Sequence, residues 1–253
     1  MKKRMKWSPL ALLAVAGILL GISTVGSTQA ALTYYSENYM AEVTVSNIGV
    51  SLLENGKVVS RRNYLEDDKW DEKTGVLLND LTGGEPLTLG KTYKEELSVR
   101  NSGAIDTYVR VVLTKSWQHD KDGDGVYEKD TTLSPDLIHL HLLTGENNWV
   151  EDTEASTAER NVLYYTEILP SEAETPILSD TLQIDPSVGT KVIRTETKDD
   201  NGTTVVYTYE YDGYKFVIEA EVDAVQTHNA KDAIKSAWGV DMTVATDGSL
   251  SLQ

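Results

Sequence analysis

The sequence predicts an all-β protein: an antiparallel, jelly-roll-like β-sandwich with one short helix near the C-terminus and a signal helix at the N-terminus. Three observations support this class. Polar and apolar residues alternate in about nine to eleven short runs, Gly, Asn and Asp cluster between the runs, and a single stretch has helical periodicity. The aromatic residues, thirteen Tyr and five Trp but one Phe, suit a half-solvated sheet better than a thick core.

Residues 1–30 have the pattern of a secretory signal peptide. Basic residues at positions 2–6 precede the uncharged apolar run 10–22, and small residues lead to a cleavage site at Ala30–Ala31. The run spans roughly 20 Å as a helix, short of the ~30 Å hydrocarbon core, which favours cleavage over the alternative of an uncleaved membrane anchor. We therefore expect a secreted, extracellular protein in which residues 31–253 form a single domain without an internal linker.

Composition restricts the partners. The formal net charge is −17, so a nucleic acid is not an expected partner, because phosphate binding rests on Lys and Arg. We expect the protein to contact a membrane only through its signal segment, if that segment is not cleaved. The chain has no Cys, which means that the secreted domain is stabilised without disulfides.

Turn residues divide the mature chain into hairpins. Two alternating runs on either side of Asn101-Ser102-Gly103, within residues 89–117, predict a central hairpin. Asn55-Gly56 predicts a second hairpin, and residues 188–222 predict a three-strand meander. Further strands are expected at 137–143 and 161–169.

The predicted helix covers residues 229–239. Asn229 is placed to cap its first turn, and Gly239 fits the position after its last turn. The spacing of its apolar residues predicts one buried stripe, formed by Ala230, Ala233, Ile234, Ala237 and Trp238.

Residues 31–46 have two interpretations. As a donor strand, the segment adds to an exposed sheet edge of another molecule through main-chain hydrogen bonds, with alternating side chains giving specificity. Alternatively it is the ordinary first strand of its own sheet. The residues expected to serve assembly in the first interpretation are Tyr34, Tyr35, Met40, Val43 and Val45.

The acidic stretch 120–128 is a candidate calcium site. Carboxylates at loop positions one, three and five, a Gly at six, a carbonyl at seven and a carboxylate at nine can surround Ca²⁺ with oxygens. The corresponding residues are Asp120, Asp122, Asp124, Gly125, Val126 and Glu128. Thr131 replaces the bidentate Glu that an EF-hand requires at position twelve, with Asp130 as a substitute ligand, so a hairpin-loop site is expected instead. The alternative is a solvated acidic hairpin tip.

The other patterns that could indicate a binding or catalytic site favour structural roles instead. His139 and His141 share one strand face and are more consistent with a solvated face than with metal ligands. Tyr207, Tyr209 and Tyr211 are expected on a half-buried sheet face, with a carbohydrate platform as the alternative. No Cys, G-x-S-x-G or H-E-x-x-H occurs, so we do not expect an enzyme.

Several short motifs follow one another along the chain in an order that is typical of a known family. They are Thr33-Tyr34-Tyr35-Ser36, Leu97–Gly103 followed by Tyr108-Val109-Arg110-Val111, the Tyr-rich stretch 161–178, and Ala224-Val225-Gln226 followed by Ala237-Trp238-Gly239. In this order they resemble the TasA/camelysin family of exported proteins from Gram-positive bacteria, over most of residues 10–240. One departure is Pro170-Ser171-Glu172, where the family commonly has Pro-Gly-Glu, and this changes the type of turn.

The resemblance implies a jelly-roll sandwich and processing by a specialised signal peptidase. It also implies, for some members, biofilm-matrix fibres in which the N-terminal segment of one subunit completes the sheet of the next. We therefore expect a structural protein of the cell surface or biofilm matrix that polymerises with itself or binds other matrix components. The alternatives are a monomeric adhesive or ligand-binding sandwich stabilised by calcium and, third, a camelysin-like metalloprotease.

Overall fold

The computed structural model describes residues 48–64, 69–199 and 202–253. The signal segment, the cleavage site at Ala30–Ala31 and the segment 31–46, with all five of its expected assembly residues, lie outside the described residues. Among the helices of the described ranges, none has both the length and the apolar character needed to cross a membrane.

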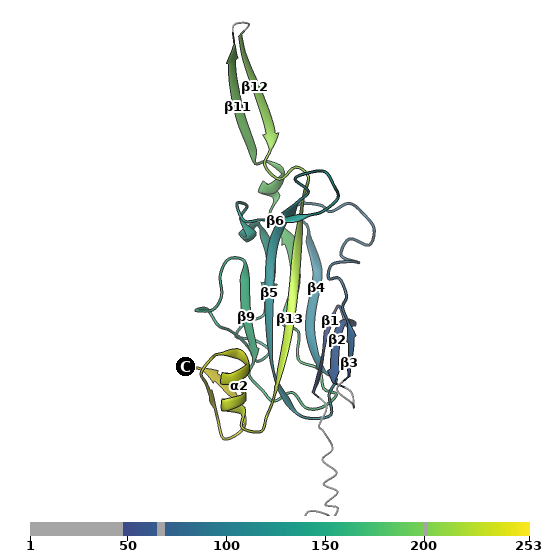
Figure 1. Ribbon diagram of the computed structural model, residues 1–253, viewed down its shortest axis with the longest axis vertical. Helices are drawn as coiled ribbons and strands as arrows, with labels where there is room; N and C mark the ends of the chain where they lie inside the picture. The colour runs from purple at the N-terminus through teal and green to yellow at the C-terminus, as the bar shows by residue number, and fades with distance from the viewer. Residues whose placement is uncertain (1–47, 65–68, 200–201) are drawn as a thin grey trace, which may run out of the picture. The chain divides into compact units, whose positions relative to one another are not determined.

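The two largest antiparallel sheets of the described chain face each other, which confirms the predicted all-β sandwich (Figure 1). Sheet A has the strand order β3 (Trp70–Lys73), β2 (Lys57–Tyr64), β1 (Gly49–Glu54), β4 (Thr92–Asn101), β10 (Ser179–Ile184) and β7 (Ile138–Leu142). Sheet B has the order β13 (Tyr214–Gln226), β5 (Thr107–His119), β9 (Arg160–Tyr165) and β8 (Trp149–Glu151), with β6 (Glu128–Asp130) also paired to β5.

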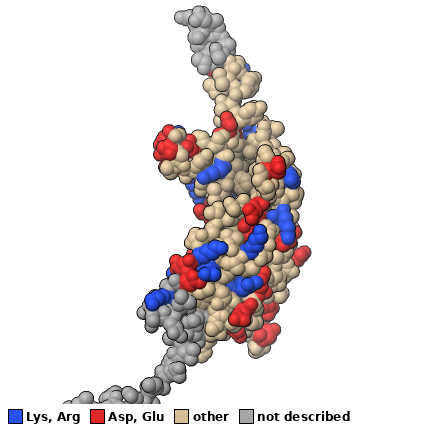
Figure 2. Space-filling view, turned by 90° about the vertical axis from the view of Figure 1, so that its right-hand side faces the viewer, with Lys and Arg blue, Asp and Glu red and all other residues tan. Residues whose placement is uncertain are grey.

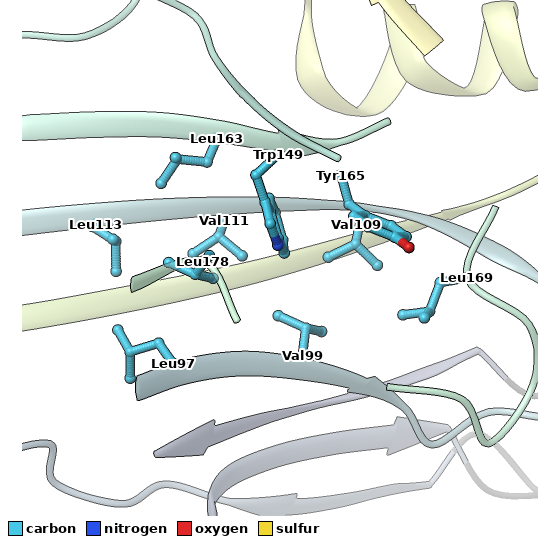
Figure 3. Close-up of a cluster of buried hydrophobic side chains, with 10 residues drawn as sticks. All are labelled: Leu97, Val99, Val109, Val111, Leu113, Trp149, Leu163, Tyr165, Leu169 and Leu178. Atoms are coloured by element: carbon cyan, nitrogen blue, oxygen red, sulfur yellow. The ribbon is translucent and has the colours of Figure 1, made fainter. Parts of the chain in front are cut away.

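The main hydrophobic core fills the space between the two sheets (Figure 3). Alternation along β4 and β5 turns one side chain in two toward this space, as the period of a strand requires. The buried cluster comprises Leu97, Val99, Val109, Val111, Leu113, Trp149, Leu163, Tyr165, Leu169 and Leu178. The indole N–H of Trp149 donates to the carbonyl of Pro176 at 3.0 Å, so the largest side chain of the cluster keeps its polar atom bonded.

The predicted central hairpin at residues 89–117 is wrong, because β4 belongs to sheet A and β5 to sheet B. The turn between them is an arch over the end of the core. The Asn101 amide, which is fully buried, donates to the carbonyls of Ile105 at 2.7 Å and Leu169 at 3.0 Å, and its oxygen accepts the N–H of Gly103 at 2.9 Å. Alternation shows which residues face the core, but it does not show whether two successive strands pair or face each other.

The Asn-Gly hairpin is confirmed. β1 and β2 pair with Glu54 opposite Lys57. Asn55 has φ 50° and Gly56 φ 77°, and two positive φ angles are what a two-residue type I′ turn requires. The N–H of Asn55 also donates to the Glu96 carbonyl at 2.7 Å, which ties the turn to β4.

The predicted three-strand meander is correct only in its first two strands. β11 (Val192–Asp199) and β12 (Gly202–Tyr209) pair with each other, whereas β13 pairs with β5 along its whole length, from Tyr214 opposite His119 to Gln226 opposite Thr107. The expected half-buried Tyr face is also wrong: Tyr207 and Tyr209 are exposed, and Tyr211 lies beyond the strand, buried against Trp117.

The helix α2 (Ala230–Trp238) and the hairpin of β14 (Met242–Val244) and β15 (Leu250–Leu252) contribute to a second cluster with Tyr108 and Tyr164 of sheet B. Gly239 ends the helix as predicted, with φ 74° and its N–H bonded to the Lys235 carbonyl. Two details of the prediction are wrong. Asn229 has a left-handed backbone and makes no side-chain cap, and Ala237 is exposed. Two single-turn 3₁₀ helices, η1 (Pro135–Leu137) and η2 (Pro186–Gly189), precede β7 and β11.

Candidate functional site

The two sheets end differently on one side of the sandwich. Sheet A continues beyond β1 through β2 and β3, but sheet B ends at β13. In Figure 1, β2 and β3 lie beyond β13 at the right-hand side of the sandwich. Within the described part of the chain, no strand pairs with the outer edge of β13, which is 13 residues long. An unpaired edge of this length leaves a row of backbone donors and acceptors open to another strand.

An open cleft of 440 Å³ lies beside this edge. Val50 and Leu52 of β1 and Ala220 and Val222 of β13 line it with apolar side chains. Of these four, Val50, Ala220 and Val222 also pack against the main core. The polar lining residues are Ser60, Arg61, Arg62, Glu72, Lys73, Thr74, Glu221 and Asp223. The cleft therefore has the apolar floor and polar rim that a half-buried strand requires.

A strand with alternating apolar residues has the chemistry to fill this position. Its backbone would pair with the edge of β13, and every second side chain would cover the apolar floor. The segment 31–46 is long enough, because sixteen extended residues span roughly 50 Å and the thirteen of β13 span about 43 Å. The donor segment is a prediction from the sequence, whereas the acceptor edge can be recognised only from the strand order.

The acidic loop between β5 and β6 is closed by its own carboxylates. Asp120 accepts the backbone N–H of Asp124 at 3.1 Å and of Gly125 at 2.9 Å, and Asp124 accepts the N–H of Val126 at 2.8 Å. Asp130 accepts the hydroxyl of Tyr214 at 3.0 Å. No three His, Asp or Glu side chains within the described ranges are grouped so as to hold a metal ion. Calcium binding by this loop stays a prediction.

Each strand-face histidine contacts a carboxylate near β10. His139 lies 3.3 Å from Asp185, and His141 lies 2.7 Å from Asp180. Hydrogen bonds from Ser187, and then from His139, lower the pKa of Asp185 to about 2. Both histidines are exposed while Ile138 is fully buried, which confirms the solvated-face interpretation.

Glu95 is a buried carboxyl that the sequence reasoning did not treat as a site. It is 1% exposed, and neither of its oxygens has a hydrogen-bond donor among the described residues. Burial, followed by the adjacent Glu54, raises its pKa to about 8. Glu54 accepts the N–H of Leu78 at 2.6 Å and lines a second cleft of 330 Å³. The burial of Glu95 could have been found from the alternation along β4, because Glu95 occupies the same face of the strand as Leu97 and Val99.

Comparisons with known proteins add no relative: no family model, curated protein or solved structure matches the chain.

Proposed function

We propose that the protein is a secreted structural subunit of the cell surface or biofilm matrix. It polymerises when residues 31–46 of one subunit pair, as a donor strand, with the β13 edge of the next. One observation carries the proposal: sheet B ends at β13 while sheet A continues through β2 and β3. The resemblance of the sequence motifs to the TasA/camelysin family supports the same function.

The proposed contact has two components. Main-chain hydrogen bonds to the outer edge of β13 give most of the affinity, and they depend little on sequence. The alternating residues Val43 and Val45 cover the apolar floor near Ala220 and Val222, which sets the register. A contact of this kind is head-to-tail, so repetition produces an open filament when the rotation between successive subunits does not close a ring.

Electron microscopy of the purified mature chain tests the proposal with a matched pair of variants. Ala220→Lys places a long charged side chain in the cleft, whereas Glu219→Lys adds the same side chain at an exposed neighbouring position of β13 that does not line the cleft. We expect filaments from the parent and from Glu219→Lys, and folded monomers from Ala220→Lys. Circular dichroism verifies that both variants are folded.

Deletion of residues 31–40 tests the donor side of the same contact. The shortened chain is expected to remain a folded monomer and to form no filaments alone. If the shortened chain polymerises as well as the mature protein does, the donor-strand proposal is wrong. Globular particles from the intact mature chain would instead favour the monomeric adhesive sandwich.

A further inference from the structure

The β11–β12 hairpin exposes several large apolar side chains. Its two strands pair only with each other among the described strands. Six large apolar side chains of the hairpin are each at least 37% exposed: Val192, Ile193, Val205, Val206, Tyr207 and Tyr209. A two-stranded sheet is marginally stable in water at best, and exposed apolar patches commonly mark binding surfaces. The hairpin therefore has the character of half of an interface.

The two outer edges of the hairpin differ in charge. β11 has the sequence VIRTETKD, and Arg194 and Glu196 form an ion pair at 2.9 Å on it. β12 has the sequence GTTVVYTY, which contains no charged residue and no Pro. Charged side chains and Pro on an edge strand oppose pairing with other chains, so β11 carries a protection that β12 lacks. The edge open to a partner is that of β12.

The composition of β12 fits a second copy of this chain. Antiparallel pairing about a two-fold axis at Tyr207 places Val205 opposite Tyr209 of the second copy and Tyr207 opposite itself. Directly opposed residues share a face, and aromatic pairs with aromatic or β-branched residues stabilise a sheet. This register is the one that opposes each of Val205, Tyr207 and Tyr209 with an apolar residue.

Charge opposes contact between copies less at this strand than over the charged sandwich. The chain carries a formal net charge of −17, so two copies repel each other over most approaches. In Figure 2 the charged side chains gather over the sandwich, whereas the described part of the hairpin is mostly uncharged. Pairing of β12 brings together two like-charged molecules through a strand that contributes no charge of its own.

We infer that β12 is a homotypic docking strand, which pairs with β12 of a second copy to form a four-stranded sheet in the order β11, β12, β12, β11. This contact is independent of the proposed donor strand, because it uses a different strand and a two-fold axis. It joins subunits side by side, and it forms whether or not the mature chain polymerises through β13.

Single cysteines test the position of the two-fold axis. The chain contains no Cys, so an introduced thiol is the only one present. In the mature chain carrying Tyr207→Cys, the two thiols face each other across strands whose opposed Cα atoms are about 4.5–5.5 Å apart, within reach of a disulfide. Ile193→Cys is the matched control, because Ile193 is similarly exposed but lies on β11.

Under mild oxidation we expect at least tenfold faster dimer formation from Tyr207→Cys than from Ile193→Cys, measured on non-reducing gels. Equal rates from the two thiols, or no dimer from Tyr207→Cys, overturn the inference. Thermal melting of the reduced variants checks that both are folded like the parent.

A charge exchange at the same position provides a second measurement. Tyr207→Lys and Tyr207→Glu each place like charges opposite each other at the axis, and sedimentation should show at least a tenfold weaker β12 contact for either alone. An equimolar mixture of the two restores association through opposite charges. If the mixture associates no better than its components, β12 does not pair with itself.

Discussion

Replacing Glu95 by Gln should stabilise the protein at alkaline pH and leave it almost unchanged at acidic pH. Glu95 is 1% exposed, and its pKa is raised from an ordinary 4.5 to about 8, mainly by burial and then by Glu54. Because the pKa of Glu95 is higher in the folded state than in the unfolded state, the unfolded chain loses this proton at a lower pH than the folded chain does. The contribution of Glu95 to stability is therefore fully present below pH 4.5 and is lost as the pH rises toward 8.

The size of the effect follows from the two pKa values. Each tenfold change in proton affinity corresponds to about 1.36 kcal/mol, which gives an upper limit of roughly 4 to 5 kcal/mol for full ionisation of Glu95. Movement of Glu54 and entry of water relieve part of this cost, so we expect Glu95→Gln to raise the free energy of unfolding by about 2 kcal/mol at pH 9. For a domain of this size, that corresponds to roughly 4 to 8 °C in melting temperature.

The measurement is thermal unfolding by circular dichroism at about pH 5, 7 and 9, where the difference between variant and parent isolates one carboxyl. Glu96→Gln is the control. The Glu96 carboxylate pairs with Lys94 at the surface, and such a pair contributes little to the free energy of unfolding. The reasoning is refuted if Glu95→Gln changes the melting temperature equally at pH 5 and pH 9. A destabilised variant at pH 9 would contradict it as well.

Three further predictions concern the arch, the helix end and the acidic loop. Asn101→Ala removes three hydrogen bonds that close the arch and should cost about 3 kcal/mol in urea unfolding, whereas an unchanged midpoint would show that the arch closes without Asn101. Gly239→Ala forces a left-handed backbone on a residue with a Cβ and should lower stability by about 1 kcal/mol, measured in the same way. Millimolar Ca²⁺ should raise the melting temperature of the parent but not that of Asp122→Ala, and equal rises would remove the loop as the site.

The sequence predicted features that depend on neighbouring residues. The Asn55-Gly56 turn, the end of α2 at Gly239 and the alternation along β13 all follow from local conformational preferences and from the period of a strand. The burial of Glu95 could also have been predicted, because its position in β4 shares the phase of the apolar residues.

The features that were not predicted depend on which strands become neighbours. β4 and β5 have the pattern of a hairpin, yet their apolar faces meet across the core because Asn101 turns the chain from one sheet to the other. β13 was assigned to the same meander as β12, but it pairs instead with β5. The acceptor edge of the candidate site was therefore invisible in the sequence, since it exists only because β13 is the last strand of sheet B.

The free edges of the described strands are not protected equally. β3 and β8 are four and three residues long, and short edge strands pair poorly with other chains. β11 carries charges, and the outward face of β7 carries two histidines that contact carboxylates. The edge of β13 carries charged residues but is 13 residues long, and the edge of β12 has no charged residue. The two proposed contacts therefore fall on the longest of these edges and on the one that has no charged residue.

These two contacts differ in symmetry, and this makes them separable by experiment. The β13 contact joins different surfaces and extends a filament, whereas the β12 contact joins identical surfaces and closes as a pair. In electron micrographs, Tyr207→Lys should leave filaments intact but separate those that associate side by side. Ala220→Lys should abolish filaments while Tyr207→Cys in the same chain still cross-links to a dimer. If either substitution removes both contacts, the two edges do not act independently, and a single interface must account for the assembly.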